Sequence, residues 1–371
     1  MNTAPPTFLN NLLPKIVPCE RLNLKEGEII VHAPGFEDRT MDITQSIMPC
    51  SDSRAILFDY LPHKPTNKLT QVREELERLG VTIKDEDILK YNRFEPGNFE
   101  SILEHRFKSH AINHVIIDIS TMSKLLLILV LNACYKLNLK ISIIYCEAKN
   151  YHPNQEKFKT SKLNGEIHQP TLQIYTGVQG VVRVKSLSSV AMQGQPTAAI
   201  VFMSFNNNLT QVLLNTVYPG RLFLINGRPP GHSWREEATA WIHDQVRQEW
   251  KEDNPVSIAD KNSVAMPKRI TSTLDYRETI CLLLEMYWQL STNHRILLAP
   301  SGSKMQAVGC FLLKALHPDV HIEYPSPVGF AEEYSEGIGN RWLLDFGNIS
   351  ERLEMISNAE REEYLEIRLN K

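Results

Sequence analysis

The stretch RILLAPSGSKMQAVGCFLLKALHP, residues 295–318, indicates a strand, a loop and a helix in that order. Ile296–Ala299 is a short apolar run, Pro300–Lys304 forms a Gly/Ser loop, and Met305–Leu316 has a helical pattern that Pro318 stops. A strand feeding such a loop predicts an anion site, because unpaired backbone N–H groups and the positive helix end face one point. The alternative is an ordinary strand-to-helix turn with a serine as its N-cap.

The same pattern occurs earlier in the chain. Val115–Ile119 is an apolar run, Ser120–Lys124 is the loop, and Leu125–Leu137 has the pattern of a helix. Aligning Ser123-Lys124 with Ser303-Lys304 also aligns the strands before the loops and the helices after them. Recurrence of a whole supersecondary unit indicates an internal duplication.

Length and composition are typical of a globular protein of two domains. The chain has 371 residues, of which 42% are apolar and 22% are charged. Its net charge of −3 gives no general attraction to nucleic acid or to anionic membranes. The six cysteines lie far apart without a CxxC pair, which is typical of reduced thiols in a cytosolic protein. We see no signal peptide, and the most apolar run, Leu125–Leu131, is too short to span a bilayer, so we expect a cytoplasmic protein without a membrane partner.

Alternating strands and helices predict an α/β fold built from two tandem Rossmann-like units with parallel sheets. Residues 1–24 read as an N-terminal extension and 25–156 as the first domain. Residues 157–195 read as a linker with a small β-hairpin made of Thr171–Tyr175 and Val181–Val184. Residues 196–371 read as the second domain, with one helix over Trp234–Trp250 and a helical tail at the end. Two unrelated α/β halves that agree by coincidence are the alternative.

Ligands of open parallel sheets bind beyond the carboxyl ends of the strands, so the strand exits supply the candidate site residues. Their side chains and backbone donors suit phosphates, ribose hydroxyls and base edges. The candidate ligand-binding residues are Gly35, Arg39, Ser120, Thr121, Ser123 and Lys124 in the first half, and Asn206, Arg228, Ser301, Gly302, Ser303, Lys304 and Gln306 in the second. The catalytic candidates at these exits are Glu37, Asp38, His63 and His232.

Several common motifs do not occur in the sequence. No GxGxxG follows either first strand, which disfavours a nicotinamide or flavin cofactor, and GxxxxGK[ST], HExxH and GxSxG are missing as well. No paired Cys/His set suggests a metal site. The sequence therefore predicts a phosphate-bearing ligand, most simply a nucleotide, without identifying a cofactor.

The runs VIIDISTMSK (115–124) and LLAPSGSKMQ (297–306) resemble the strand-exit motif of the CRISPR-associated Rossmann-fold (CARF) sensor domains. In that family an apolar strand ends in a Gly/Ser/Thr-Lys turn that opens a helix, and two copies bind a cyclic oligonucleotide second messenger. The resemblance implies a sensor or regulatory component of a prokaryotic antiviral defence system, with a protein partner that carries the effector activity. This sequence departs from the pattern at Met122, where a glycine is usual, and carries one glycine in the second turn.

A fainter resemblance is to the ATP pyrophosphatases, whose Ser-Gly-Gly-x-Asp-Ser loop is similar to Ser301–Gln306 but contains an aspartate that is missing here. Two other functions therefore stay open. One is an enzyme that processes a nucleotide at the same strand exits. The other is a scaffold or interaction protein in which both turns merely cap helices.

Overall fold

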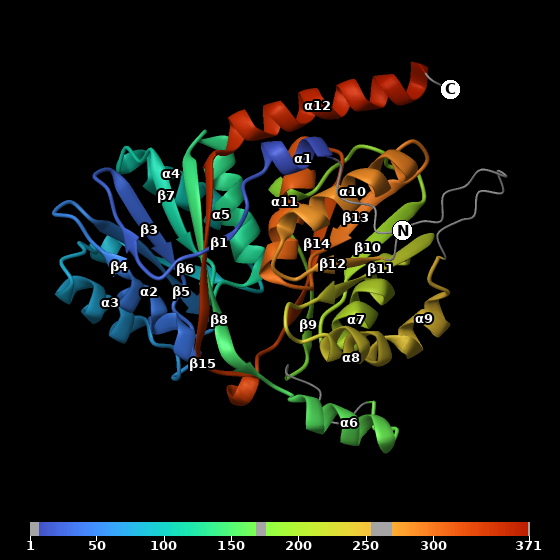
Figure 1. The fold of residues 1–371 in the computed structure, drawn as a ribbon, viewed down its shortest axis with the longest axis horizontal. Helices are drawn as coiled ribbons and strands as arrows, with labels where there is room; N and C mark the ends of the chain where they lie inside the picture. The colour runs from blue at the N-terminus through green and yellow to red at the C-terminus, as the bar shows by residue number, and fades with distance from the viewer. Residues whose placement is uncertain (1–6, 168–175, 254–268, 370–371) are drawn as a thin grey trace. The chain divides into compact units, whose positions relative to one another are not determined.

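The computed structural model describes residues 7–167, 176–253 and 269–369 of the chain (Figure 1). These residues divide into two compact units. Unit A consists of Asn11–His152 and Glu332–Lys371, and unit B consists of Met1–Asn10 and Pro153–Ala331, where the structure describes them. The short helix α1 (Thr7–Leu12) spans the division in the sequence. We treat the two units separately.

Unit A has a seven-stranded sheet in the order β1-β15-β8-β7-β3-β5-β6. Its parallel strands are β3 (Glu28–His32), β5 (Arg54–Leu61), β6 (Ile88–Asn92), β7 (His114–Asp118) and β8 (Lys140–Tyr151). The long strand β15 (Ser335–Asn348) pairs antiparallel with β8, and β1 (Val17–Pro18) pairs antiparallel with β15. Two further short strands, β2 (Leu22–Asn23) and β4 (Ile47–Met48), pair with each other.

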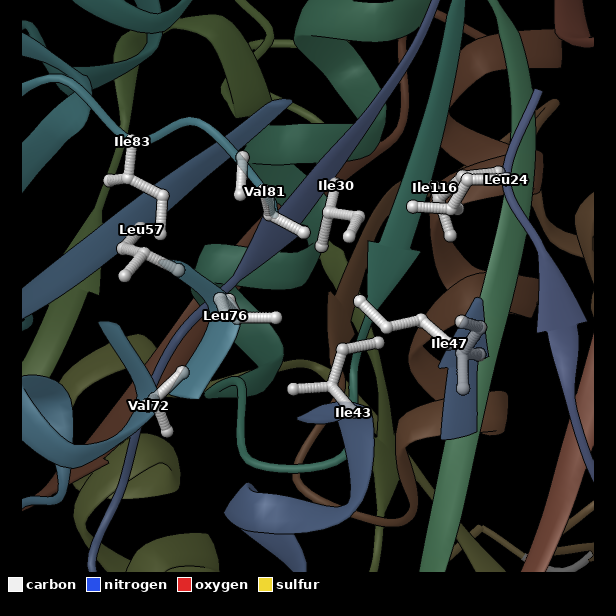
Figure 2. Close-up of a cluster of buried hydrophobic side chains, with 12 residues drawn as sticks. Leu24, Ile30, Ile43, Ile47, Leu57, Val72, Leu76, Val81, Ile83 and Ile116 are labelled. Carbon is white, nitrogen blue, oxygen red and sulfur yellow. The ribbon is translucent and has the colours of Figure 1, made fainter. Parts of the chain in front are cut away.

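Helices cover both faces of this sheet, as buried apolar strands require. Ile43 of α2 (Asp42–Ser46) and Val72 of α3 (Leu69–Arg78) pack with Ile30 and Ile116 against one face (Figure 2). Phe99 of α4 (Phe99–Ser109) contacts Phe58 on the other face. The remaining elements of the unit are η1 (Asp38–Met41), η2 (Asp85–Asp87), α5 (Lys124–Lys136), η4 (Glu332–Tyr334) and α12 (Ile349–Leu369).

Unit B has a six-stranded sheet in the order β12-β11-β10-β13-β14-β9. Its parallel strands are β10 (Thr197–Phe202), β11 (Arg221–Arg228), β12 (Ile270–Ser272), β13 (Arg295–Ala299) and β14 (His321–Pro327), with β9 (Val178–Arg183) antiparallel to β14. Its helices are α6 (Gln155–Leu163), η3 (Lys185–Leu187), α7 (Asn207–Val217), α8 (Trp234–Ile242), α9 (Asp244–Trp250), α10 (Tyr276–Leu290) and α11 (Lys304–Leu316). Helices α7 and α9 pack against one face of the sheet.

The two sheets share one topology, which confirms the predicted α/β class and the recurrence of the Rossmann-like unit. In chain order, the five parallel strands of each unit lie third, second, first, fourth, fifth across the sheet, and an antiparallel strand flanks the fifth. The pairing registers agree as well. His32 of β3 pairs with Asp118 of β7, and the equivalent pair in unit B is Ile200 of β10 with Leu298 of β13.

Several predicted boundaries are wrong. Residues 332–371, expected at the end of the second domain, belong to unit A, because β15 pairs with the open edge of β8 from Lys140 to Tyr151. Residues 157–195 are not merely a linker, since α6 and β9 belong to unit B. The N-terminal extension contributes β1 and β2.

Two predicted elements also need correction. The predicted hairpin arm Thr171–Tyr175 lies outside the described residues. The other arm lies in β9 as far as Arg183, and β9 pairs with β14. The single helix predicted over Trp234–Trp250 is two helices, α8 and α9, which meet at the buried residue His243.

Candidate functional site

Both predicted turns lie at the switch point of their sheet. The first and fourth parallel strands are neighbours, and the connections that follow them leave toward opposite faces. Open α/β sheets bind ligands at the carboxyl edge of such a point. In unit A these strands are β3 and β7, and in unit B they are β10 and β13. The turn ending at Ser123 follows β7 and the turn ending at Ser303 follows β13, so the two serines have equivalent positions.

The turn of unit A is capped by two side chains. Ser123 is the N-cap of α5, and its hydroxyl accepts a hydrogen bond from the amide of Leu126 at 3.2 Å. The amide of Ser123 donates to the hydroxyl of Tyr60 at 2.7 Å, and that hydroxyl donates to the carbonyl of Thr121 at 3.3 Å. Burial raises the pKa of Tyr60 to about 12, so this hydroxyl keeps its proton and clamps the turn.

In the turn of unit B, a capping box satisfies the equivalent amides. The hydroxyl of Ser303 accepts from the amide of Gln306 at 3.1 Å, and the side-chain oxygen of Gln306 accepts from the amide of Ser303 at 2.7 Å. A Cβ added at Gly302 would lie 2.2 Å from that oxygen, so the box requires glycine there. The side-chain amide of Gln306 also donates to Thr271 at 2.9 Å, so both ends of this candidate residue already have partners within the unit.

Lys124 is the first residue of α5, and it stands at the positive end of the helix dipole. Its side chain is half-buried and makes no hydrogen bond or ion pair with any residue that the structure describes. Burial lowers the pKa of Lys124 to about 8. A desolvated ammonium group at a helix N-terminus is unfavourable on both counts, and an anion placed there would relieve both.

The equivalent turn of unit B offers a different polar group. Lys304 begins α11 as Lys124 begins α5. The hydroxyl oxygen of Ser301 is buried and has no hydrogen-bond partner among the described residues. In unit A the equivalent hydroxyl, that of Thr121, donates to the carbonyl of Ala33 at 2.7 Å.

A buried histidine–aspartate pair that could not be predicted from the sequence precedes the turn of unit A. Nδ1 of His32 is 2.9 Å from Oδ2 of Asp118, and both side chains are almost fully buried. The other oxygen of Asp118 accepts from the amide of Ser120, whose hydroxyl accepts from the amide of Cys146 at 2.8 Å. Burial raises the pKa of Asp118, but His32 and Ser120 outweigh it and the net shift is downward.

Thr40 links this histidine–aspartate pair to the exits of β3 and β7. Its hydroxyl lies 3.4 Å from Nε2 of His32 and 3.2 Å from the hydroxyl of Thr121, and it accepts from the amide of Gly35 at 2.9 Å. A Cβ added at Gly35 would lie 3.3 Å from Cβ of Thr121. The exits of β3 and β7 are therefore held together by side-chain hydrogen bonds, with Gly35 and Ser120 as structural members of the network.

The acidic cluster at the exit of β3 is engaged within unit A. The guanidinium of Arg39 is buried and donates to Glu37 at 3.0 Å, to the carbonyl of Cys146 at 3.2 Å and to the hydroxyl of Tyr151 at 3.0 Å. Glu37 also accepts from the hydroxyl of Ser335. The structure places Arg39 in the core, whereas we expected it at the surface of a phosphate site.

The other candidate residues have local partners or lie in exposed loops. The amide of Gly337 and the ammonium of Lys68 lower the pKa of Asp38, and His63 is 3.2 Å from Asp59. Asn206 is the buried N-cap of α7, Arg228 pairs with Glu278, and His232 is exposed in the loop before α8. Within unit A, Glu37, Asp38 and His63 each have a different partner.

Two general searches of the described residues are negative. No three His, Cys, Asp or Glu side chains among them gather into a possible metal site. Within the same ranges, no helix combines the length and the apolar character that crossing a membrane requires.

Comparisons with known proteins find only weak structural similarity. No protein-family model matches the sequence, and a search of curated proteins finds no match. Among solved structures, UDP-D-quinovosamine 4-dehydrogenase from Vibrio fischeri is similar at 14% identity, over 38% of this chain and 84% of that one, with a TM-score of 0.17. A universal stress protein from Archaeoglobus fulgidus is 9% identical over 81% of this chain and 96% of that one, with a TM-score of 0.22. CobK precorrin-6A reductase is 8% identical over 82% of this chain and 89% of that one, with a TM-score of 0.21. The strand order described above carries the fold assignment.

Proposed function

We propose that the protein binds a nucleotide through its phosphate at the switch-point turns, and that it acts as a sensor or regulatory component. The observation that carries this proposal is Lys124, whose ammonium lacks a partner among the described residues and stands at the N-terminus of α5. The amide of Leu126 is bonded to Ser123, but those of Lys124 and Leu125 have no acceptor within the helix and point to the same place. A phosphate there would meet backbone donors, the helix dipole and a lysine together.

The finer part of the proposal follows from the two turns that resemble CARF domains. The ligand would be a cyclic oligonucleotide second messenger, and the protein would report its presence to a partner with effector activity in prokaryotic antiviral defence. A sensor requires a ligand that prefers one of two states of the protein. It does not require a general base beside the ligand, and the hydrogen bonds of Glu37 and Asp38 are already directed to neighbours in unit A.

Calorimetric titration of the purified chain with ATP and with a cyclic oligoadenylate tests the proposal. Lys124→Ala should weaken binding by roughly 1–3 kcal/mol, which corresponds to about 5-fold to 150-fold. Lys108→Ala is the matched control, because Lys108 is an exposed lysine on α4. Equal losses of affinity in the two variants would show that the lysines act only through the overall charge of the protein, and would contradict a phosphate site at Lys124.

Recovery of the ligand separates a sensor from an enzyme. After long incubation with the protein, a sensor's ligand should be recovered intact by chromatography. Repeated turnover that Glu37→Gln abolishes, with binding retained, would replace the sensor by a nucleotide-processing enzyme. A chain that binds no phosphate-bearing ligand at all would leave the scaffold as the function.

A further inference from the structure

Unit B carries aromatic side chains beyond the carboxyl ends of β10 and β11. Phe205 follows β10, and Trp234 begins α8 after the loop that leaves β11. Their rings meet edge to face, with centroids 6.2 Å apart. The guanidinium of Arg235 lies over both rings, 5.1 Å from the centroid of Phe205 and 4.8 Å from that of Trp234. An indole with a cation beside it is a surface on which nucleobases stack.

The chain itself occupies one face of this indole. The ring of Phe158, from α6, is stacked on Trp234 with centroids 5.7 Å apart and an interplanar angle of 27°. The edge of Trp241 contacts Phe158 at 5.8 Å, and Phe158 is buried. A planar aromatic ring thus already lies where a base would stack on Trp234.

Most side chains of helix α6 are exposed. Of its nine residues, Phe158 and Ser161 are buried, whereas Leu163 is 87% exposed. Lys162 forms an ion pair with Glu237 in which both side chains are exposed, and such pairs contribute little stability. In Figure 1, α6 lies beside α8 at the edge of the unit. The stacked ring of Phe158 is therefore the main apolar anchor of this helix.

The aromatic surface and the phosphate turn belong to one edge of the sheet. Strands β11, β10 and β13 are adjacent and parallel, so the exit of β11 lies about 10 Å, two strand spacings, from the exit of β13. Between them, the backbone of Gly302 approaches Phe202, the last residue of β10; a Cβ added at Gly302 would lie 3.1 Å from that of Phe202. The ring of Trp234 contacts that of Phe205, three residues after Phe202, so the indole belongs to the same edge of the sheet as the turn at Gly302.

We propose that Trp234 is the base-binding surface of unit B for a purine ring, and that Phe158 of α6 competes with the base for it. The inference rests on the proposed phosphate site and adds the ligand's base and its competitor. Binding would exchange one stacked ring for another and release α6. The competition predicts that removing the phenyl ring strengthens binding of the base, whereas an ordinary core residue would weaken it.

Titration with ATP and with inorganic tripolyphosphate tests this inference on the full chain. Phe158→Ala should raise ATP affinity about 10-fold, and Trp234→Leu should lower it about 10-fold. Both variants should leave tripolyphosphate affinity unchanged, because that ligand has no base. Leu163→Ala, on the exposed side of α6, should change neither affinity. Hydrogen exchange of the unmodified chain should show faster exchange in α6 on addition of ATP but not of tripolyphosphate.

The possible failures are distinct. If tripolyphosphate binds and Phe158→Ala weakens ATP or changes both ligands alike, the base site is wrong and the phosphate site stands. Protection of α6 by ATP would also overturn the competition. If neither ATP nor tripolyphosphate binds the unmodified chain, the proposed function is wrong and the base site falls with it. Because the exchange measurement needs no variant, a folding defect in Phe158→Ala does not obscure the result.

Discussion

Replacement of Lys124 by methionine should stabilise the protein and weaken its ligand binding at the same time. Methionine keeps the length and apolar stem of the side chain and removes its charge. The ammonium of Lys124 is half-buried at the positive end of α5, without a hydrogen-bond or ion-pair partner in the parts of the chain described above. Replacing a residue that stabilises the fold lowers the stability of the protein. Replacing a residue that serves to bind an anion should instead raise it.

The magnitude follows from the lowered pKa. Burial moves the pKa of Lys124 from its ordinary value of 10.5 to about 8. Each pKa unit corresponds to about 1.4 kcal/mol, which sets an upper bound of about 3 kcal/mol on the cost of the charge. Because the side chain keeps some contact with solvent, we expect a gain of about 1–2 kcal/mol in the free energy of unfolding at pH 7.

The pH dependence of stability tests independently whether the charge of Lys124 destabilises the folded protein. The folded pKa lies below the unfolded value, so the unfolded chain binds more protons between about pH 8 and 10.5, and the wild type gains stability as the pH rises through this window. The advantage of Lys124→Met should therefore shrink between pH 7 and 9.5. Phosphate affinity of the wild type should fall over the same range, as the ammonium loses its proton.

Urea denaturation at the two pH values and calorimetry with ATP provide the measurements. Lys108→Met, at an exposed position of α4, should change the stability by less than about 0.5 kcal/mol at either pH. Loss of stability in Lys124→Met, or a gain that is independent of pH, would refute the account of a desolvated charge. Unchanged ATP affinity in a stabilised variant would refute the anion site alone.

Three further predictions concern groups inside the units. Asp118→Leu should destabilise unit A by about 3–5 kcal/mol in urea denaturation because it leaves His32 buried without its partner. The double variant His32→Ile, Asp118→Leu copies the apolar pair of unit B and should recover most of that loss. Gly302→Ala should lower the free energy of unfolding by about 1–2 kcal/mol because it displaces the side chain of Gln306. The loss should be smaller when Gln306 is already alanine, and equal losses in both backgrounds would contradict the steric crowding. Burial lowers the pKa of His243 to about 4, so up to about 3 kcal/mol of stability should be lost as the pH falls from about 6.5 to 4, and His243→Gln should flatten that slope.

Features that depend on a few neighbouring residues could be predicted from the sequence. Ser123 and Ser303 are N-caps because a hydroxyl reaches the amide three residues later, whatever the rest of the chain does. The apolar run at the start of α5 is buried from Leu125 to Cys134, as a helix apolar on all sides must be. The repetition of these local patterns predicted two Rossmann-like units with parallel sheets, whereas the strand order came from the structure.

Features that depend on distant pairing could not be predicted. Strand β15 joins the sheet of unit A through a pairing with β8 that no local pattern announces. Arg39 was a ligand-binding candidate, but Glu37 neutralises its guanidinium, and two other acceptors, the carbonyl of Cys146 and the hydroxyl of Tyr151, lie far along the chain. His32 gave a usable signal, since an imidazole at the end of a fully buried strand needs a partner, but naming Asp118 as that partner required the register between β3 and β7.

The two turns satisfy the N-cap amide of their helices with different side chains. In unit B the oxygen that satisfies the N-cap amide comes from Gln306, three residues into the helix. The equivalent residue of α5 is Leu126, which has no such oxygen, and the hydroxyl of Tyr60 from the neighbouring strand β5 takes its place. In both helices the N-cap and third amides are satisfied. In unit A the proposed phosphate would therefore meet the amides of the first two helical residues, which begin with Lys124. If this reasoning holds, Tyr60→Phe should open the Ser123 amide to the ligand and change phosphate affinity in unit A while α5 stays folded. A Tyr60→Phe variant whose affinity is unchanged although its turn has loosened would show that the phosphate does not bind at this helix end.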